Sequence, residues 1–101
     1  MAIAIYLSDE KQFLFNIDDK QCDLLTSIFE AYRYRTGLVI DPYGNSKLTT
    51  ENQQTLVNII DQYVKETDLN KDKQKTTAIL ELRALMKLSI ANNYTLLLAG
   101  D

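Results

Sequence analysis

The chain has 101 residues, with 46% hydrophobic and 25% charged side chains, a formal net charge of −3 and no histidine. This length and balance predict a single globular domain over residues 1–101 and argue against disorder. The missing imidazole removes the commonest catalytic base and metal ligand, and the single Cys22 excludes an internal disulfide. We therefore expect a protein that is not an enzyme and holds neither a metal nor a cofactor.

The N-terminal residues MAIAIYLSDE contain no Lys or Arg and turn acidic after a short apolar run, which does not fit a signal peptide. No apolar run approaches the roughly 20 residues needed to cross a bilayer. With a lone cysteine, these features predict a cytoplasmic protein that does not associate with membranes.

The first predicted element is a β-hairpin over residues 3–7 and 13–17, joined by the polar segment SDEKQ. Both segments alternate in hydrophobicity with period two, as half-buried strands do. The side chains expected to face the core are Ile3, Ile5, Leu7, Phe13, Phe15 and Ile17.

Three helices are predicted next, each with apolar residues at helical spacing. The first spans residues 20–36, with Asp18 or Asp19 as N-cap, Tyr32 on its core face and Gly37 as the left-handed C′ residue. The second begins after Thr49 or Thr50 and ends in the polar segment ETDLNKDKQK. The third covers residues 73–92.

The C-terminal residues YTLLLAGD predict an interior strand that pairs with the start of the chain. The predicted order is then β-β-α-α-α-β, in which a small sheet is packed by three helices. This arrangement belongs to the α+β class.

The segment GLVIDPYGNSKLT, residues 37–49, contains two of the three glycines and the only proline. It lacks the closely spaced glycines and the Gly-Lys-Ser/Thr of a phosphate loop. Asp41-Pro42-Tyr43-Gly44 fits a β-turn, so we interpret the segment as a structured connection whose apolar start covers the core. The alternative is a binding loop that presents Tyr43.

Two further stretches contain residue types that can form sites. Asp68, Asn70 and Asp72 match the first positions of a calcium loop, but Lys73 replaces the required Gly and Ile79 the bidentate Glu. Cys22 has no histidine or cluster of cations beside it in sequence that would lower its pKa. We interpret the first as a turn between helices and the second as a buried or half-buried helix residue.

The segment EAYRYRTG, residues 30–37, is the strongest candidate for a contact surface. Tyr32 and Tyr34 are about 160° apart on a helix, so burial of Tyr32 exposes Tyr34, with Arg33 and Arg35 beside it. Tyr and Arg are enriched at the energetic centres of interfaces. A solvated Tyr34 that only lies along apolar surface is the open alternative.

Negative charge is concentrated in the first third of the chain. Residues 1–31 carry six acidic and two basic side chains, whereas residues 32–101 carry eight acidic and nine basic ones. This asymmetry disfavours nucleic-acid binding and favours a basic protein partner. The residues expected to attract that partner are Asp9, Glu10, Asp18, Asp19 and Asp23, with Arg33, Tyr34, Arg35 and Tyr43 as contact residues.

The size, the acidic balance, the Gly…Asp-Pro-Tyr-Gly connection and the ending LLLAGD resemble small bacterial immunity proteins, which are paired with toxins delivered between competing cells. The resemblance implies a tight cytoplasmic complex with a toxin domain, often a basic nuclease, whose active site or substrate path is blocked. A self-associating structural or regulatory module is the alternative, so the free protein is expected to be a monomer or a homodimer.

Overall fold

The computed structural model describes residues 2–8, 12–41 and 43–100. These residues form four strands and three helices in the order β-β-α-β-α-α-β. The strands are β1 (Ile3–Leu7), β2 (Phe13–Ile17), β3 (Asn45–Leu48) and β4 (Leu96–Gly100), and the helices are α1 (Asp19–Thr36), α2 (Thr50–Glu66) and α3 (Lys73–Ala91). The predicted α+β class, with a small sheet packed by helices, is confirmed.

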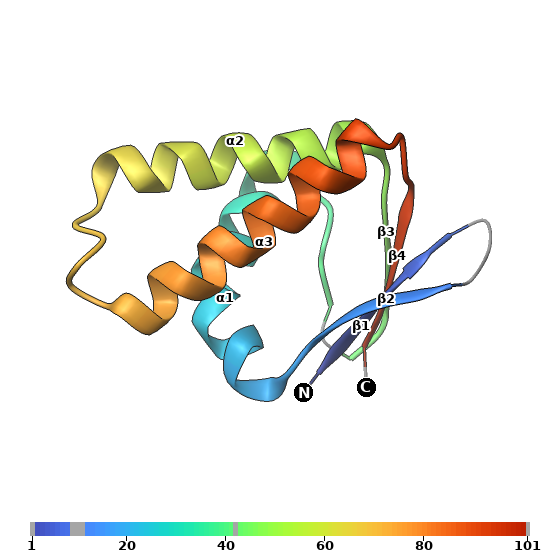
Figure 1. The fold of residues 1–101 in the computed structure, drawn as a ribbon, viewed down its shortest axis with the longest axis horizontal. Coiled ribbons are helices and arrows are strands. Elements are labelled where there is room, and N and C mark those ends of the chain that lie inside the picture. The colour runs from blue at the N-terminus through green and yellow to red at the C-terminus, as the bar shows by residue number, and fades with distance from the viewer. Residues whose placement is uncertain (1, 9–11, 42, 101) are drawn as a thin grey trace.

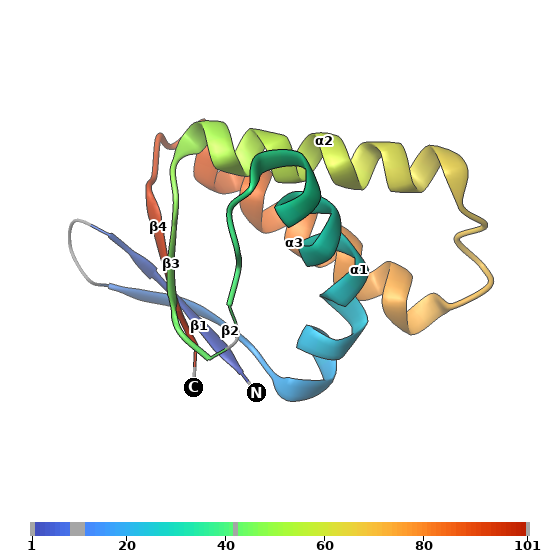
Figure 2. The same ribbon diagram turned by 180° about the vertical axis from the view of Figure 1, so that it is seen from behind.

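The sheet has the strand order β2-β1-β4-β3, and all its neighbours are antiparallel. The predicted pairing of the C-terminal strand with the start of the chain is confirmed, since Ile3 pairs with Gly100 and Leu7 with Leu96. The three helices gather on one side of this sheet (Figures 1 and 2). β4 is an interior strand, as its run of leucines predicted.

Strand β3 was not predicted, because its sequence Asn-Ser-Lys-Leu shows no apolar alternation. It is a strand because β4 offers an open edge: Ser46 pairs with Leu98 and Leu48 with Leu96. Of its four residues only Leu48 is buried, and the other three are exposed or half-buried. Backbone pairing with β4 rather than side-chain burial therefore makes this segment a strand.

The predicted inward orientation of Phe13 is wrong. The β1–β2 register shifts between Ile5 and Tyr6, so that Phe13 pairs with Tyr6 on the face turned away from the helices. The two rings meet edge to face, with centroids 5.7 Å apart. Phe15 pairs with Ile5 on the helix-facing side and lines a small hollow with Leu25 of α1 and Leu82 of α3, where it remains 37% exposed.

Side-chain caps define where each helix begins. Asp18 accepts a hydrogen bond from the backbone N–H of Gln21, whose side chain accepts one from the Asp18 N–H. Thr49 and Asn52 form the same capping box on α2, and Asp72 caps α3 through the Lys75 N–H. These caps resolve the alternatives left open by the sequence in favour of Asp18 and Thr49.

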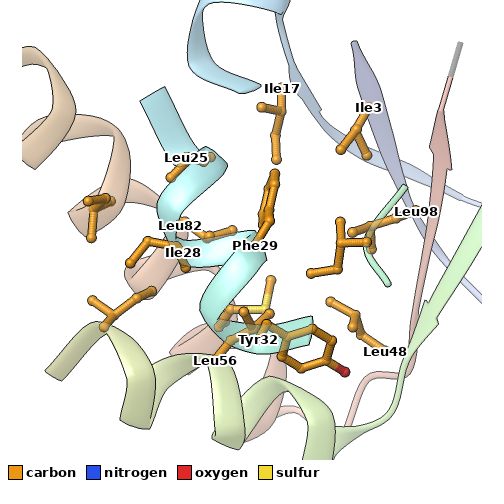
Figure 3. Packing of buried hydrophobic residues seen from close by; sticks show 14 of the residues in the cluster. Ile3, Ile17, Leu25, Ile28, Phe29, Tyr32, Leu48, Leu56, Leu82 and Leu98 are labelled. Carbon is orange, nitrogen blue, oxygen red and sulfur yellow. The ribbon is translucent and has the colours of Figure 1, made fainter. Parts of the chain in front are cut away.

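Helix α1 packs against α2 and α3, and its buried side chains join the core that the three helices share with the sheet. Its buried residues are Cys22, Leu25, Ile28, Phe29 and Tyr32. In Figure 3, Phe29 points toward Ile17 of β2, while the Tyr32 ring points toward Leu48 of β3. The same core contains buried residues of α2 and α3.

Buried polar groups also lie within this core, and Gln53 is the one that joins several elements. Gln53 is fully buried, and its Nε2 donates to the carbonyl oxygens of Leu48 at 3.0 Å and Tyr94 at 2.8 Å. Its amide therefore joins α2 to the end of β3 and to the connection before β4. Within the described part of the chain, the Gln53 Oε1 and the Tyr32 hydroxyl have no hydrogen-bond partner.

The Gln53 cross-link gives a stability prediction. Gln53→Met keeps the length of the side chain but removes the donor shared by two carbonyl groups. Because an unsatisfied buried polar group is costly, we expect the free energy of unfolding to fall by about 1–3 kcal/mol. Urea unfolding would measure the change. Gln54→Met is the matched control at an exposed position, and equal stability of the two variants would contradict the cross-link.

Candidate functional site

The outer surface of α1 brings together several of the predicted contact residues. At about 100° of rotation per residue, positions 19, 23, 30 and 34 fall within about 60° of one another around the helix axis. We call Asp19, Asp23, Glu30 and Tyr34 the α1 stripe; all four are exposed. From Asp19 to Tyr34 it extends about 22 Å along the helix.

Tyr34 has the exposure that the helical spacing predicted. Tyr32 is 1% exposed and fills the core, whereas Tyr34 is 95% exposed at the C-terminal end of the stripe. Arg33 and Arg35 lie in the last turn of α1, where positive charge is favourable beside the C-terminal end of the helix dipole. Arg35 is rotated about 100° from Tyr34, so it leaves the stripe.

A groove borders the stripe along one side of α1. Its volume is about 190 Å³, and its lining consists of Cys22, Asp23, Thr26, Phe29, Glu30, Arg33, Val39 and Ile40. Cys22, Phe29 and Ile40 are buried and form an apolar floor, while the other lining residues are exposed and form the rim. We call this feature the α1 groove.

The opposite wall of the α1 groove is the segment that follows α1. Gly37 takes the left-handed conformation predicted for C′, with φ of 77°, and its N–H donates to the Arg33 carbonyl oxygen. The chain then passes between α1 and β3 (Figure 2). The Ser46 hydroxyl of β3 donates to the Val39 carbonyl oxygen at 3.1 Å and accepts from the Asp41 N–H at 3.3 Å.

The prediction that the apolar start of this segment covers the core holds only for Ile40, which is buried. Leu38 and Val39 are 50% and 51% exposed. The Asp41 Oδ1 accepts from the Tyr43 N–H, and the Asp41 carbonyl oxygen accepts from the Gly44 N–H at 3.2 Å, so the predicted turn is present. The segment is therefore a structured connection that also builds one side of a groove.

The carboxylates on the groove rim are available to a partner. Asp23 and Glu30 are exposed, and neither has an ion-pair partner among residues 2–8, 12–41 and 43–100. Sequence reasoning did not select Glu30 as a site residue, although its spacing of seven from Asp23 places both on one side of a helix. The groove itself could not be inferred from spacing, because Val39 and Ile40 approach α1 only in the folded chain.

Other predicted site residues lie elsewhere or have structural roles. Asp9 and Glu10 lie outside the described residues. Asp18 is committed to the N-cap of α1. Tyr43 is 71% exposed. It precedes β3, at the same end of the sheet where β2 leads into α1. Strands β3 and β2 are three strand spacings, or roughly 14 Å, apart across the sheet. Tyr43 therefore does not join Tyr34, which is at the far end of α1.

The calcium-loop interpretation finds no support in the geometry. Asp68 accepts a hydrogen bond from the Asn70 N–H, and Asp72 caps α3. Across the described ranges, no three His, Cys, Asp or Glu side chains are placed to hold a metal ion. None of the helices in those ranges has both the length and the apolar character needed to cross a membrane.

Cys22 is a buried helix residue, as predicted. Its thiol points to the Ile17 carbonyl oxygen, with 3.7 Å between Sγ and O. Burial raises the pKa of this thiol above its ordinary value of 9.0, and the carboxylates of Asp19, Asp23 and Asp18 act in the same direction. Cys22 is therefore an unreactive, protonated part of the groove floor near neutral pH.

No protein-family model, curated protein or solved structure matches the chain. Its surface geometry and charge are therefore the basis for assigning a function.

The raised thiol pKa makes stability depend on pH. The unfolded chain releases the Cys22 proton at lower pH than the folded chain. The stabilisation that comes from the protonated, buried thiol is therefore intact below about pH 9, and it declines as the pH rises through the folded-state pKa. We expect Cys22→Ala to lose less unfolding free energy than wild type between pH 8 and pH 10. Urea unfolding at each pH measures this, with the exposed Ser27→Ala as control. Parallel plots of unfolding free energy against pH for wild type and both variants would contradict this role of the Cys22 thiol.

Proposed function

We propose that the protein is an immunity-type binding protein that neutralises a cognate basic toxin domain in the cytoplasm. In this proposal the α1 stripe and α1 groove bind the toxin, a nuclease in the favoured case, and cover its active site or substrate path. The protein acts by forming a tight complex and carries out no reaction of its own.

One observation carries the proposal: an apolar groove, a nearly fully exposed tyrosine and two carboxylates without an ion-pair partner among the described residues share one surface of α1. Asp23 and Glu30 provide negative charge that accelerates encounter with a basic partner. Tyr34 and the groove floor provide apolar area that slows dissociation, since buried aromatic contacts dominate interface energies. Charge and apolar surface together are what a tight inhibitor of a basic protein requires.

Self-association is the second candidate, and the outer face of the sheet favours it. The rings of Tyr6 and Phe13 meet edge to face there, and Leu97 of β4 pairs with Tyr6 on the same face. Phe13 is 54% exposed. Sedimentation velocity separates the candidates, because a dimer through this face depends on protein concentration and is weakened by Phe13→Lys, whereas the toxin complex is unaffected by this change.

The toxin-binding proposal is tested by affinity capture of the tagged protein from the cells that produce it. We expect a stoichiometric, basic companion that stops growth when produced alone and is tolerated when the wild-type protein is produced with it. The variant Asp23→Lys/Glu30→Lys should slow association with that companion by about tenfold or more at low salt, because steering is lost. Stopped-flow or surface-based kinetics would measure the rate.

The matched control is Glu51→Lys/Glu81→Lys, which changes the net charge equally at exposed positions on α2 and α3. This control should associate nearly as fast as wild type. If both double variants slowed equally, only net charge would matter and the α1 surface would not be the binding site. Capture of no companion, or of one without toxicity, would contradict the proposed function.

A further inference from the structure

We propose that the α1 groove is a binding site for an arginine side chain presented by a protein partner. The aliphatic stem would lie on the groove floor and the guanidinium at the Asp23 end. This inference names the side chain that the partner inserts, and it rests on the proposed function for its biological role.

The lining of the groove matches the two parts of such a side chain. Cys22, Phe29 and Ile40 are buried and offer apolar surface to methylene groups, while exposed Val39 forms part of the far wall. An arginine can bury its stem along apolar surface while its charged head stays at the rim. The guanidinium is weakly hydrated, so it suits this half-apolar site with a carboxylate on its rim better than an ammonium group.

The charges along the groove select which end the guanidinium occupies. Asp23 lies on the rim at one end of the groove. Arg33 lines the other end, ten residues or about 15 Å along the helix, where its positive charge repels an incoming cation. The groove is therefore most negative near Asp23, which orients the incoming side chain.

The fold does not commit the carboxylates of Asp23 and Glu30 to a structural contact within the described residues. Neither Asp23 nor Glu30 caps a helix, and neither is paired with a cation within the part of the chain that the structure describes. An arginine from a partner would supply the missing counter-charge.

The test uses n-butylguanidinium as the probe and n-butylurea as its neutral isostere. Each is titrated into the ¹⁵N-labelled protein and followed by NMR. We expect n-butylguanidinium to shift the backbone amides of Cys22, Asp23, Thr26, Phe29 and Val39, and to bind about two- to fivefold more tightly than n-butylurea, the range for one exposed ion pair. Equal binding of the two probes, or no shifts at the groove, would overturn the proposal.

Two neighbouring positions provide a matched pair of variants. Val39 and Leu38 are equally exposed, but only Val39 lines the groove. Val39→Lys places a positive charge in the groove wall and should abolish the shifts, whereas Leu38→Lys should preserve them. Asp23→Asn should weaken binding about two- to fivefold, and Glu51→Gln should leave it unchanged.

The same spectra report whether each variant is folded, so loss of binding can be separated from unfolding. The probe is a small cation that tests the groove alone. Its failure to bind would therefore refute the groove site but not the proposed toxin complex, which can form through the rest of the α1 surface. Conversely, specific probe binding without any captured toxin would sustain the groove site and refute the proposed function. Retention of probe binding by Val39→Lys, or its equal loss in Leu38→Lys, would refute the groove site.

Discussion

The burial of one face of α1 in the core that it shares with the sheet and the other two helices is the constraint on which the rest of the structure depends. Its inner face, from Cys22 to Tyr32, is buried, and Phe29 and Tyr32 reach toward the sheet (Figure 3). Because an α-helix turns about 100° per residue, burying this face forces Asp23, Glu30 and Tyr34 into solvent. The acidic and aromatic character of the surface therefore follows from the same geometry that fills the core.

The connection after α1 shows how a structural requirement also creates a surface feature. Gly37 ends the helix in a left-handed conformation, and the chain returns beside α1 to reach β3. Backbone groups in such a segment need hydrogen-bond partners, and the Ser46 hydroxyl serves both the Val39 carbonyl and the Asp41 N–H. Holding this segment against β3 leaves the α1 groove between it and the helix.

The surface that results combines charge that acts at a distance with apolar area that acts on contact. Unpaired carboxylates attract a basic protein during encounter, and their effect weakens as salt screens them. The groove floor and Tyr34 act only after water is displaced, so they influence the lifetime of a complex. In the proposed toxin complex, the carboxylates would set the association rate, and the groove floor with Tyr34 would set the dissociation rate.

The sequence alone determined the features that depend on local periodicity and end effects. Alternation predicted β1, helical spacing predicted the buried Tyr32 and exposed Tyr34, and Gly37 marked the end of α1. Asp19, Asp23 and Tyr34 of the α1 stripe belong to this class as well, whereas Glu30 was not selected although the same helical spacing implies it.

Only the tertiary structure decided features that join residues distant in the chain. Strand β3 exists because β4 presents an open edge, Phe13 faces outward because the hairpin register shifts, and Gln53 is buried because two carbonyl groups meet its amide. The α1 groove arises where Val39 and Ile40 pass beside α1. Such contacts leave no local pattern, because the free energy that stabilises them comes from partners brought together only by folding.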